Sequence, residues 1–218
     1  MHPGRGLRQA LDRGHRRQWA AGLGVAVVLI AALVVLDQPT HTTTAYQRAG
    51  LSSYLVSIEG DISGCNSGLA DSIKAAVATL DGSPAIQPGA ASTFTSTAIA
   101  DCSFTNNGVV DIADLQPPHG IGSPTIDAVA PKVAKWVFPD AFTLLQDLAV
   151  VLSSPRHRTA RRAFTKEVGV LEAERHGIET LVRGAERGVG SSPKQLPLTS
   201  VTVLLKGDRL PPAKAPAS

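Results

Sequence analysis

The fold is decided by residues 51–84, which read LSSYLVSIEGDISGCNSGLADSIKAAVATLDGSP. Apolar residues recur in this stretch at steps of three and four, the pattern of a helix that buries one face. The turn-forming sequence Asp81-Gly82-Ser83-Pro84 follows and predicts the end of that helix. The predicted buried stripe consists of Leu51, Leu55, Ile58, Ile62, Cys65, Leu69, Ile73, Val77 and Leu80.

A second segment after this turn shows the same spacing, in Ala90, Phe94, Ala98, Cys102 and Thr105, and stops at Asn106-Asn107-Gly108. Residues 92–97 are rich in β-branched and hydroxyl side chains, which also suits a strand. Their apolar spacing is not two, however, so we predict a second helix. The two segments then form an antiparallel helical hairpin.

The two cysteines of the chain lie at matching heights on this hairpin. Cys65 precedes the turn by sixteen residues and Cys102 follows it by eighteen, so the two Cα atoms come close enough for a bond. We therefore predict a structural disulfide, and the alternative is two free cysteines buried as small apolar side chains. Neither a C-x-x-C pair nor histidines at ligand spacing accompany them, so we expect no metal site.

The remainder of the chain continues as helices joined by short connections. Ser123 or Thr125 is placed to cap a helix that runs to Val137, Pro139 suits the first turn of the next helix, and a long charged helix is predicted for 156–187. The predicted fold class is therefore all-α, a small antiparallel helical bundle with one disulfide. Residues 199–205 suit a short strand or an extended strip against the bundle, and residues 210–216 a disordered tail.

The N-terminal part predicts a membrane anchor. Residues 19–36, WAAGLGVAVVLIAALVVL, contain no charge, and a helix of eighteen residues spans about 27 Å, close to the hydrocarbon thickness of a bilayer. A cleaved signal peptide is the alternative, but the stretch is long for one and no Ala-x-Ala follows it. The small residues Ala20 and Gly24 would allow two anchors to pair as a homodimer. The residues that would determine topology are Arg5, Arg8, Arg13, Arg16 and Arg17, all before the stretch.

The predicted domain order follows from this topology. A basic cytoplasmic N-terminus, 1–18, precedes a transmembrane signal anchor, 19–36; an extracytoplasmic helical domain, 37–190, and an extended or disordered tail, 191–218, follow. The expected location is the cell membrane, with most of the chain outside. A second span at 136–152 would return the C-terminus to the cytoplasm, but it contains two aspartates that are costly to insert, so we predict a buried bundle helix there.

Charge is distributed unevenly along the chain. Residues 1–18 carry a net charge of +4, residues 37–154 carry −7, and residues 155–218 carry +6. Because the basic charge forms two separate blocks, we expect no nucleic-acid partner. The second block supplies a candidate anionic contact surface, for lipid headgroups or an acidic envelope polymer. Its charges could instead neutralise the acidic region 37–154 of the same domain or simply be solvated. Its candidate residues are Arg156, Arg158, Arg161 and Arg162.

No catalytic motif points to a reaction. The sequence has no G-x-x-x-x-G-K, H-E-x-x-H or G-x-S-x-G, so no catalytic residue can be assigned and no cofactor or metal is expected. We therefore expect a non-enzymatic interaction or envelope-assembly module that acts on an envelope protein or an anionic surface. Two alternatives stay open: a hydrolase-like envelope enzyme with scattered catalytic residues, and a small-ligand or lipid carrier with an apolar cavity.

Overall fold

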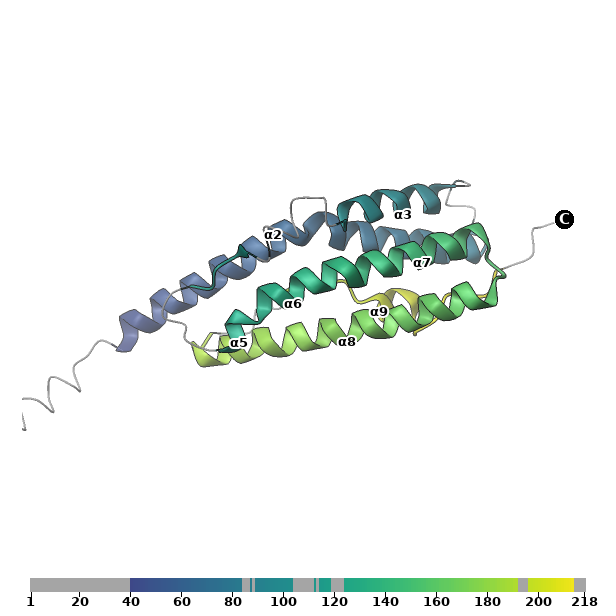
Figure 1. Cartoon of the computed structure of the whole chain (residues 1–218). Coiled ribbons are helices and arrows are strands. Elements are labelled where there is room, and N and C mark those ends of the chain that lie inside the picture. The colour runs from purple at the N-terminus through teal and green to yellow at the C-terminus, as the bar shows by residue number, and fades with distance from the viewer. Residues whose placement is uncertain are drawn as a thin grey trace, which may run out of the picture. The chain divides into compact units, whose positions relative to one another are not determined.

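The structure is a computed structural model of the whole chain (Figure 1). It describes residues 40–83, 87, 89–103, 112, 114–118, 124–191 and 196–213. The chain divides into two compact units, residues 1–43 and 44–218, and the second unit holds almost all the described residues. The predicted anchor at 19–36 and the five arginines before it therefore lie outside the described residues.

The second unit is a helical domain. In chain order its helices are α2 (Thr40–Leu80, beginning in the first unit), α3 (Ala90–Asp101), α5 (Pro124–Asp127), α6 (Val129–Lys135), the kinked segment η1 (Trp136–Ala141), α7 (Phe142–Ser153), α8 (Arg158–Gly188) and α9 (Val201–Leu205). Among the described residues there is no strand. The prediction of a mainly helical fold is confirmed.

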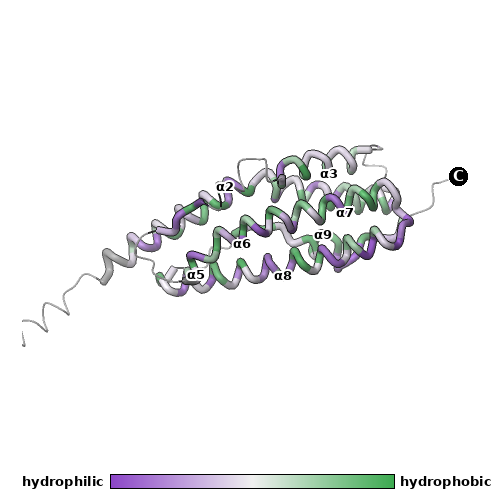
Figure 2. The backbone as a smooth tube through the Cα atoms, viewed as in Figure 1, coloured by the Kyte–Doolittle hydropathy of each residue, from purple (hydrophilic) through white to green (hydrophobic). Residues whose placement is uncertain are grey.

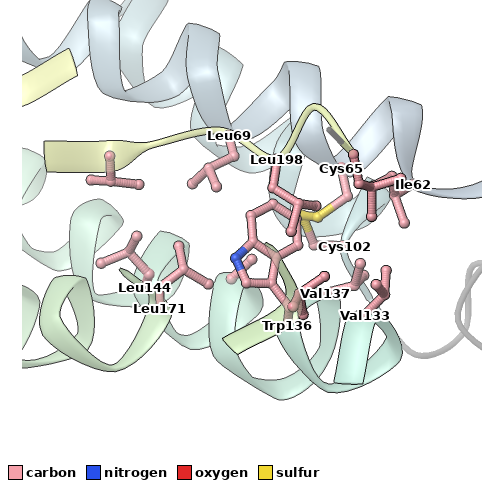
Figure 3. Close-up of a cluster of buried hydrophobic side chains, with 14 of the residues drawn as sticks. Ile62, Cys65, Leu69, Cys102, Val133, Trp136, Val137, Leu144, Leu171 and Leu198 are labelled. Carbon is pink, nitrogen blue, oxygen red and sulfur yellow. A yellow bond between two sulfur atoms is a disulfide. The ribbon is translucent and has the colours of Figure 1, made fainter. Parts of the chain in front are cut away.

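α2 and α3 form the predicted hairpin, closed by the predicted disulfide. The Cα atoms of Cys65 and Cys102 are 4.7 Å apart and their sulfur atoms are bonded. The predicted stripe of α2 is buried except Val77, which is half-buried. Close approach depends on small residues: a Cβ placed on Gly68 would lie only 3.0 Å from the Cβ of Ala98. Figure 3 shows the disulfide inside the apolar core, beside the fully buried Trp136.

The buried face of α3 differs from the predicted one. Phe94 was expected inside but is 46% exposed, whereas Ala91, Thr95 and Ala98 are buried. The Thr95 hydroxyl donates to the carbonyl of Ala91 at 2.7 Å, so its burial leaves no unmade hydrogen bond. The physical reason for the error is the close approach to α2, which only small side chains permit. Residues 92–97 are helical, so the strand alternative is excluded.

The chain from α5 to α7 is the central helical run and bends in η1. Phe138 has extended backbone angles, φ −140° and ψ 121°, and Pro139 starts the next helical stretch, as predicted. Residues 125–153 are long and apolar enough to cross a membrane, by length and composition only. In this structure many of their apolar side chains, among them Ile126, Trp136 and Leu145, are fully buried in the domain core, whereas Val150 is exposed. The predicted bundle helix at 136–152 is thus present as a packed element.

α8 is the long charged helix expected from the sequence. It buries one stripe that includes Phe164, Val168 and Ile178, and it exposes charged residues between them (Figure 2). The side chain of His157 caps its start by accepting a hydrogen bond from the amide of Ala160 at 3.2 Å. Only a short turn separates the end of α7 at Ser153 from Arg158, so α7 and α8 run side by side in opposite directions (Figure 1).

The C-terminal segment corrects two expectations. Residues 201–205 form the short helix α9 and not a strand, because the Ser200 side chain caps the helix by accepting from the amide of Val203. Local capping here overrides the β-propensity of Val201, Thr202 and Val203. Residues 196–210 of the predicted tail are also not disordered, since five of them are buried in the core: Leu196, Leu198, Val201, Leu205 and Leu210.

Candidate anion-binding site

An arginine-lined pocket forms where the first turns of α8 meet the C-terminal segment. Arg158, Arg161, Arg162 and Thr165 occupy positions i, i+3, i+4 and i+7 and therefore share one face of α8. Arg209 and Leu210 complete the lining from the C-terminal segment. The pocket has a volume of about 370 Å³, within the range of small-molecule sites.

One arginine of the pocket, Arg161, connects two segments of the chain by hydrogen bonds. The Nη2 atom of Arg161 donates to the carbonyl oxygens of Leu210 and Pro211, at 2.5 and 2.6 Å, and its Nη1 donates to that of Pro155 at 3.3 Å. Arg161 thus ties the C-terminal segment to the turn before α8. We assign it a positioning role, because carbonyls of the protein already occupy its donors.

The guanidinium groups of the other pocket arginines are largely free to bind an anion. Within the described residues, Arg158 and Arg162 are exposed and make no hydrogen bond or ion pair with another protein group. Arg209 approaches Asp208 at 3.7 Å, a surface pair that contributes little. None of the described residues that line the pocket is acidic. An anion that enters it therefore meets donors that the protein does not already satisfy.

The predicted contact cluster is thus brought together only in part. Arg158, Arg161 and Arg162 line one pocket, whereas Arg156 is exposed and does not line it. Sequence reasoning missed Arg209, because its place beside α8 depends on how the C-terminal segment packs. The alternative that these arginines neutralise acidic groups of the domain finds no support at Arg158 or Arg162.

A polar cluster on α8 explains how the C-terminal segment is held. Glu172 is only 7% exposed, and its Oε1 accepts from the Ser200 hydroxyl at 3.1 Å and the Thr202 amide at 3.0 Å. Its Oε2 accepts from Arg175 Nε at 2.7 Å. Burial alone would raise the pKa of Glu172, but these hydrogen bonds outweigh burial and lower the pKa. This cluster was not identified from the sequence.

A second ionic cluster joins the end of α6, and through Lys135 also η1, to α8. Glu174 accepts from Lys132 at 3.1 Å and from Lys135, and the hydrogen bond from Lys135 is the main reason that the pKa of Glu174 is lowered. Lys135 Nζ also lies 3.5 Å from Asp140. Burial raises the pKa of Asp140 against the opposing effect of Lys135. These contacts form a structural ion-pair network, which fixes the kinked segment on α8.

A second pocket lies at the opposite end of α8. Thr180, Arg183, Glu186, Arg187 and Ser191 line it, and its volume is about 410 Å³. Arg48, near the start of the domain, donates from Nε to the carbonyl of Val189 at 2.9 Å, which places this pocket beside the first turns of α2. Charged side chains line both pockets, unlike the apolar cavity that a lipid carrier requires. No group of three metal-ligating side chains occurs among the described residues.

Comparisons with known proteins identify no relative. No protein-family model, no curated protein and no solved structure matches the chain. The function must therefore be argued from the site itself.

Proposed function

We propose that this protein is a membrane-anchored, extracytoplasmic helical module that binds an anionic partner without chemistry of its own. The observation that carries the proposal is the arginine-lined pocket, a concave site with unpaired guanidinium groups on a domain whose interior is filled by apolar side chains. The uncharged stretch 19–36, with five arginines before it, supports the anchor.

The disulfide supports the external location. A bond between Cys65 and Cys102 persists in oxidising compartments and is rare in the cytosol. The anchor, the direction of the positive charges and the disulfide each favour the same orientation, with residues 37–218 outside.

The pocket and the contact between Arg48 and Val189 lie at opposite ends of α8. Arg48 contacts the last turn of α8, and the pocket lies at the first turn of the same helix, thirty-one residues away along its length. At 1.5 Å per residue this separation is about 45 Å. Within this domain the pocket therefore lies at the end of α8 far from Arg48.

External proteolysis of a C-terminal epitope in intact cells tests this function, combined with alkaline extraction of membranes. We expect the epitope to be digested while a cytoplasmic control protein survives, and the chain to stay in the membrane pellet. Protection of the epitope would place the arginine pocket inside the cell, and release by alkali would show that 19–36 is not an anchor. Either result would overturn the proposal.

A further inference from the structure

The pocket between α8 and the C-terminal segment has the chemistry of a phosphate site. We propose that it binds a phosphorylated group with two or more negative charges, through Arg158, Arg162 and Arg209. Arg161 holds in place the C-terminal segment that forms one side of the pocket. This inference deepens the proposed function and rests on it for the biological setting.

The arrangement of charge argues for a multiply charged ligand. Four guanidinium groups line one small volume from two segments of the chain, and none of the described residues that line it is acidic. Such groups repel one another, so the pocket is stabilised when an anion enters. A monoanion would balance the charge of only one of the two unpaired arginines, Arg158 and Arg162.

The arrangement of donors favours phosphate over carboxylate. Guanidinium groups bind both by paired hydrogen bonds, but a carboxylate offers only two oxygen atoms in one plane. The arginines reach the pocket from α8 on one side and from residue 209 on the other, which suits a tetrahedral group with oxygens on several sides.

The size of the pocket sets the scale of the ligand. A volume of about 370 Å³ exceeds what a single phosphate needs and accommodates a phosphorylated sugar or two linked phosphates. The buried side chain of Leu210 and the stem of Thr165 supply a less polar wall. A free phosphorylated compound and a phospholipid headgroup share this chemistry, and the experiment separates them.

Isothermal titration calorimetry of the purified full-length chain in a non-ionic detergent tests the inference, with pyrophosphate as the probe. We expect saturable binding of one pyrophosphate, weakened by salt. R158Q and R162Q should each weaken binding at least about fivefold, the loss of one charge-assisted hydrogen bond at an open site. Both side chains are exposed and unpaired, so the ligand-free melting temperature should not change.

R156Q is the matched control. It removes the same charge two residues away, from a side chain that does not line the pocket, and should weaken binding less than about twofold. Equal losses in R156Q and R162Q would show non-specific attraction and overturn the site. Absence of saturable binding would overturn it as well.

Two further probes identify the ligand class. Malonate, a dicarboxylate, should bind more weakly than pyrophosphate, and equal affinity would overturn the preference for phosphate. Vesicles of neutral phospholipid with and without cardiolipin, whose headgroup holds two phosphates, test the lipid source. Vesicle binding that is lost in R162Q would show that the phosphorylated group is a lipid headgroup, and vesicle binding that R162Q leaves unchanged would exclude the pocket as the lipid site. Binding of pyrophosphate to the purified protein does not depend on its topology in the cell. A failure of this inference can therefore be distinguished from a failure of the predicted topology.

Discussion

Opening the disulfide should destabilise the domain by an amount that follows from the length of the loop it closes. Cys65 and Cys102 are 37 positions apart. In the chain-entropy treatment a loop of this length restricts the unfolded chain by about 4 kcal/mol at 25 °C. Both side chains are buried, and alanine in their place keeps the site apolar at a further cost for the lost packing.

The assay is urea unfolding of the full-length chain in a non-ionic detergent, followed by far-ultraviolet circular dichroism. A slope of about 2 kcal/mol per molar urea converts 4 kcal/mol into a midpoint lowered by about 2 M. The oxidised protein is compared with the same protein in reductant and with the C65A/C102A variant. The C65A/C102A variant should not respond to reductant, which separates disulfide loss from other effects of the reagent.

A midpoint that moves by less than about 0.5 M would refute the reasoning. It would mean that the unfolded chain already keeps α2 and α3 together, so that the bond restricts little.

Three further changes test the packing and the polar clusters. G68A should destabilise the domain by about 1–3 kcal/mol, because the added Cβ would press on Ala98. G60A is the control: its Cβ meets nothing within 4 Å, so it should stabilise the domain by about 0.5–1 kcal/mol. The urea midpoints of the two variants are compared, and equal effects would contradict the close contact between α2 and α3. E172Q should weaken the fall in the free energy of unfolding that the native domain shows as the pH decreases. The pKa of Glu172 is lowered on folding, so the stabilisation by its carboxylate is complete above the ordinary pKa of 4.5 and is lost as the pH falls further. Identical pH dependence of the two proteins between pH 5 and 3 would show that the carboxylate is not held as described. L198A should destabilise the domain by about 2–4 kcal/mol and speed proteolysis of the C-terminal segment, and a neutral effect would show that the segment does not belong to the core.

Periodicity and cysteine position predict the hairpin well because both depend on local geometry. A stripe at steps of three and four lies on one face of a helix wherever that helix packs, so the buried residues of α2 and α8 follow from the sequence. Cys65 and Cys102 are predicted to lie opposite each other from their distances in sequence to the turn alone. Phe94 was placed wrongly because the face of α3 is chosen by its neighbour, whose Gly68 admits a close approach.

The C-terminal segment and the full pocket could not be predicted for a related reason. Val201, Thr202 and Val203 prefer strands, and the contacts that make them helical come from Ser200 nearby and from Glu172, far away in the sequence. Arg209 joins Arg158 and Arg162 only because this segment folds back along α8. The basic run on α8 was visible in the sequence, but the pocket that concentrates its charge depends on tertiary packing.

The oxidation state of the cysteines inside living cells tests the central claim most directly. Cells are quenched in acid, and the denatured chain is labelled with a 5-kDa maleimide, with or without prior reduction. We predict that the chain shifts on a gel by two labels only after reduction, because Cys65 and Cys102 are bonded and the proposed external location would keep them oxidised. Two labels without reduction would show that the cysteines are free in the cell, and would contradict an external, disulfide-closed domain.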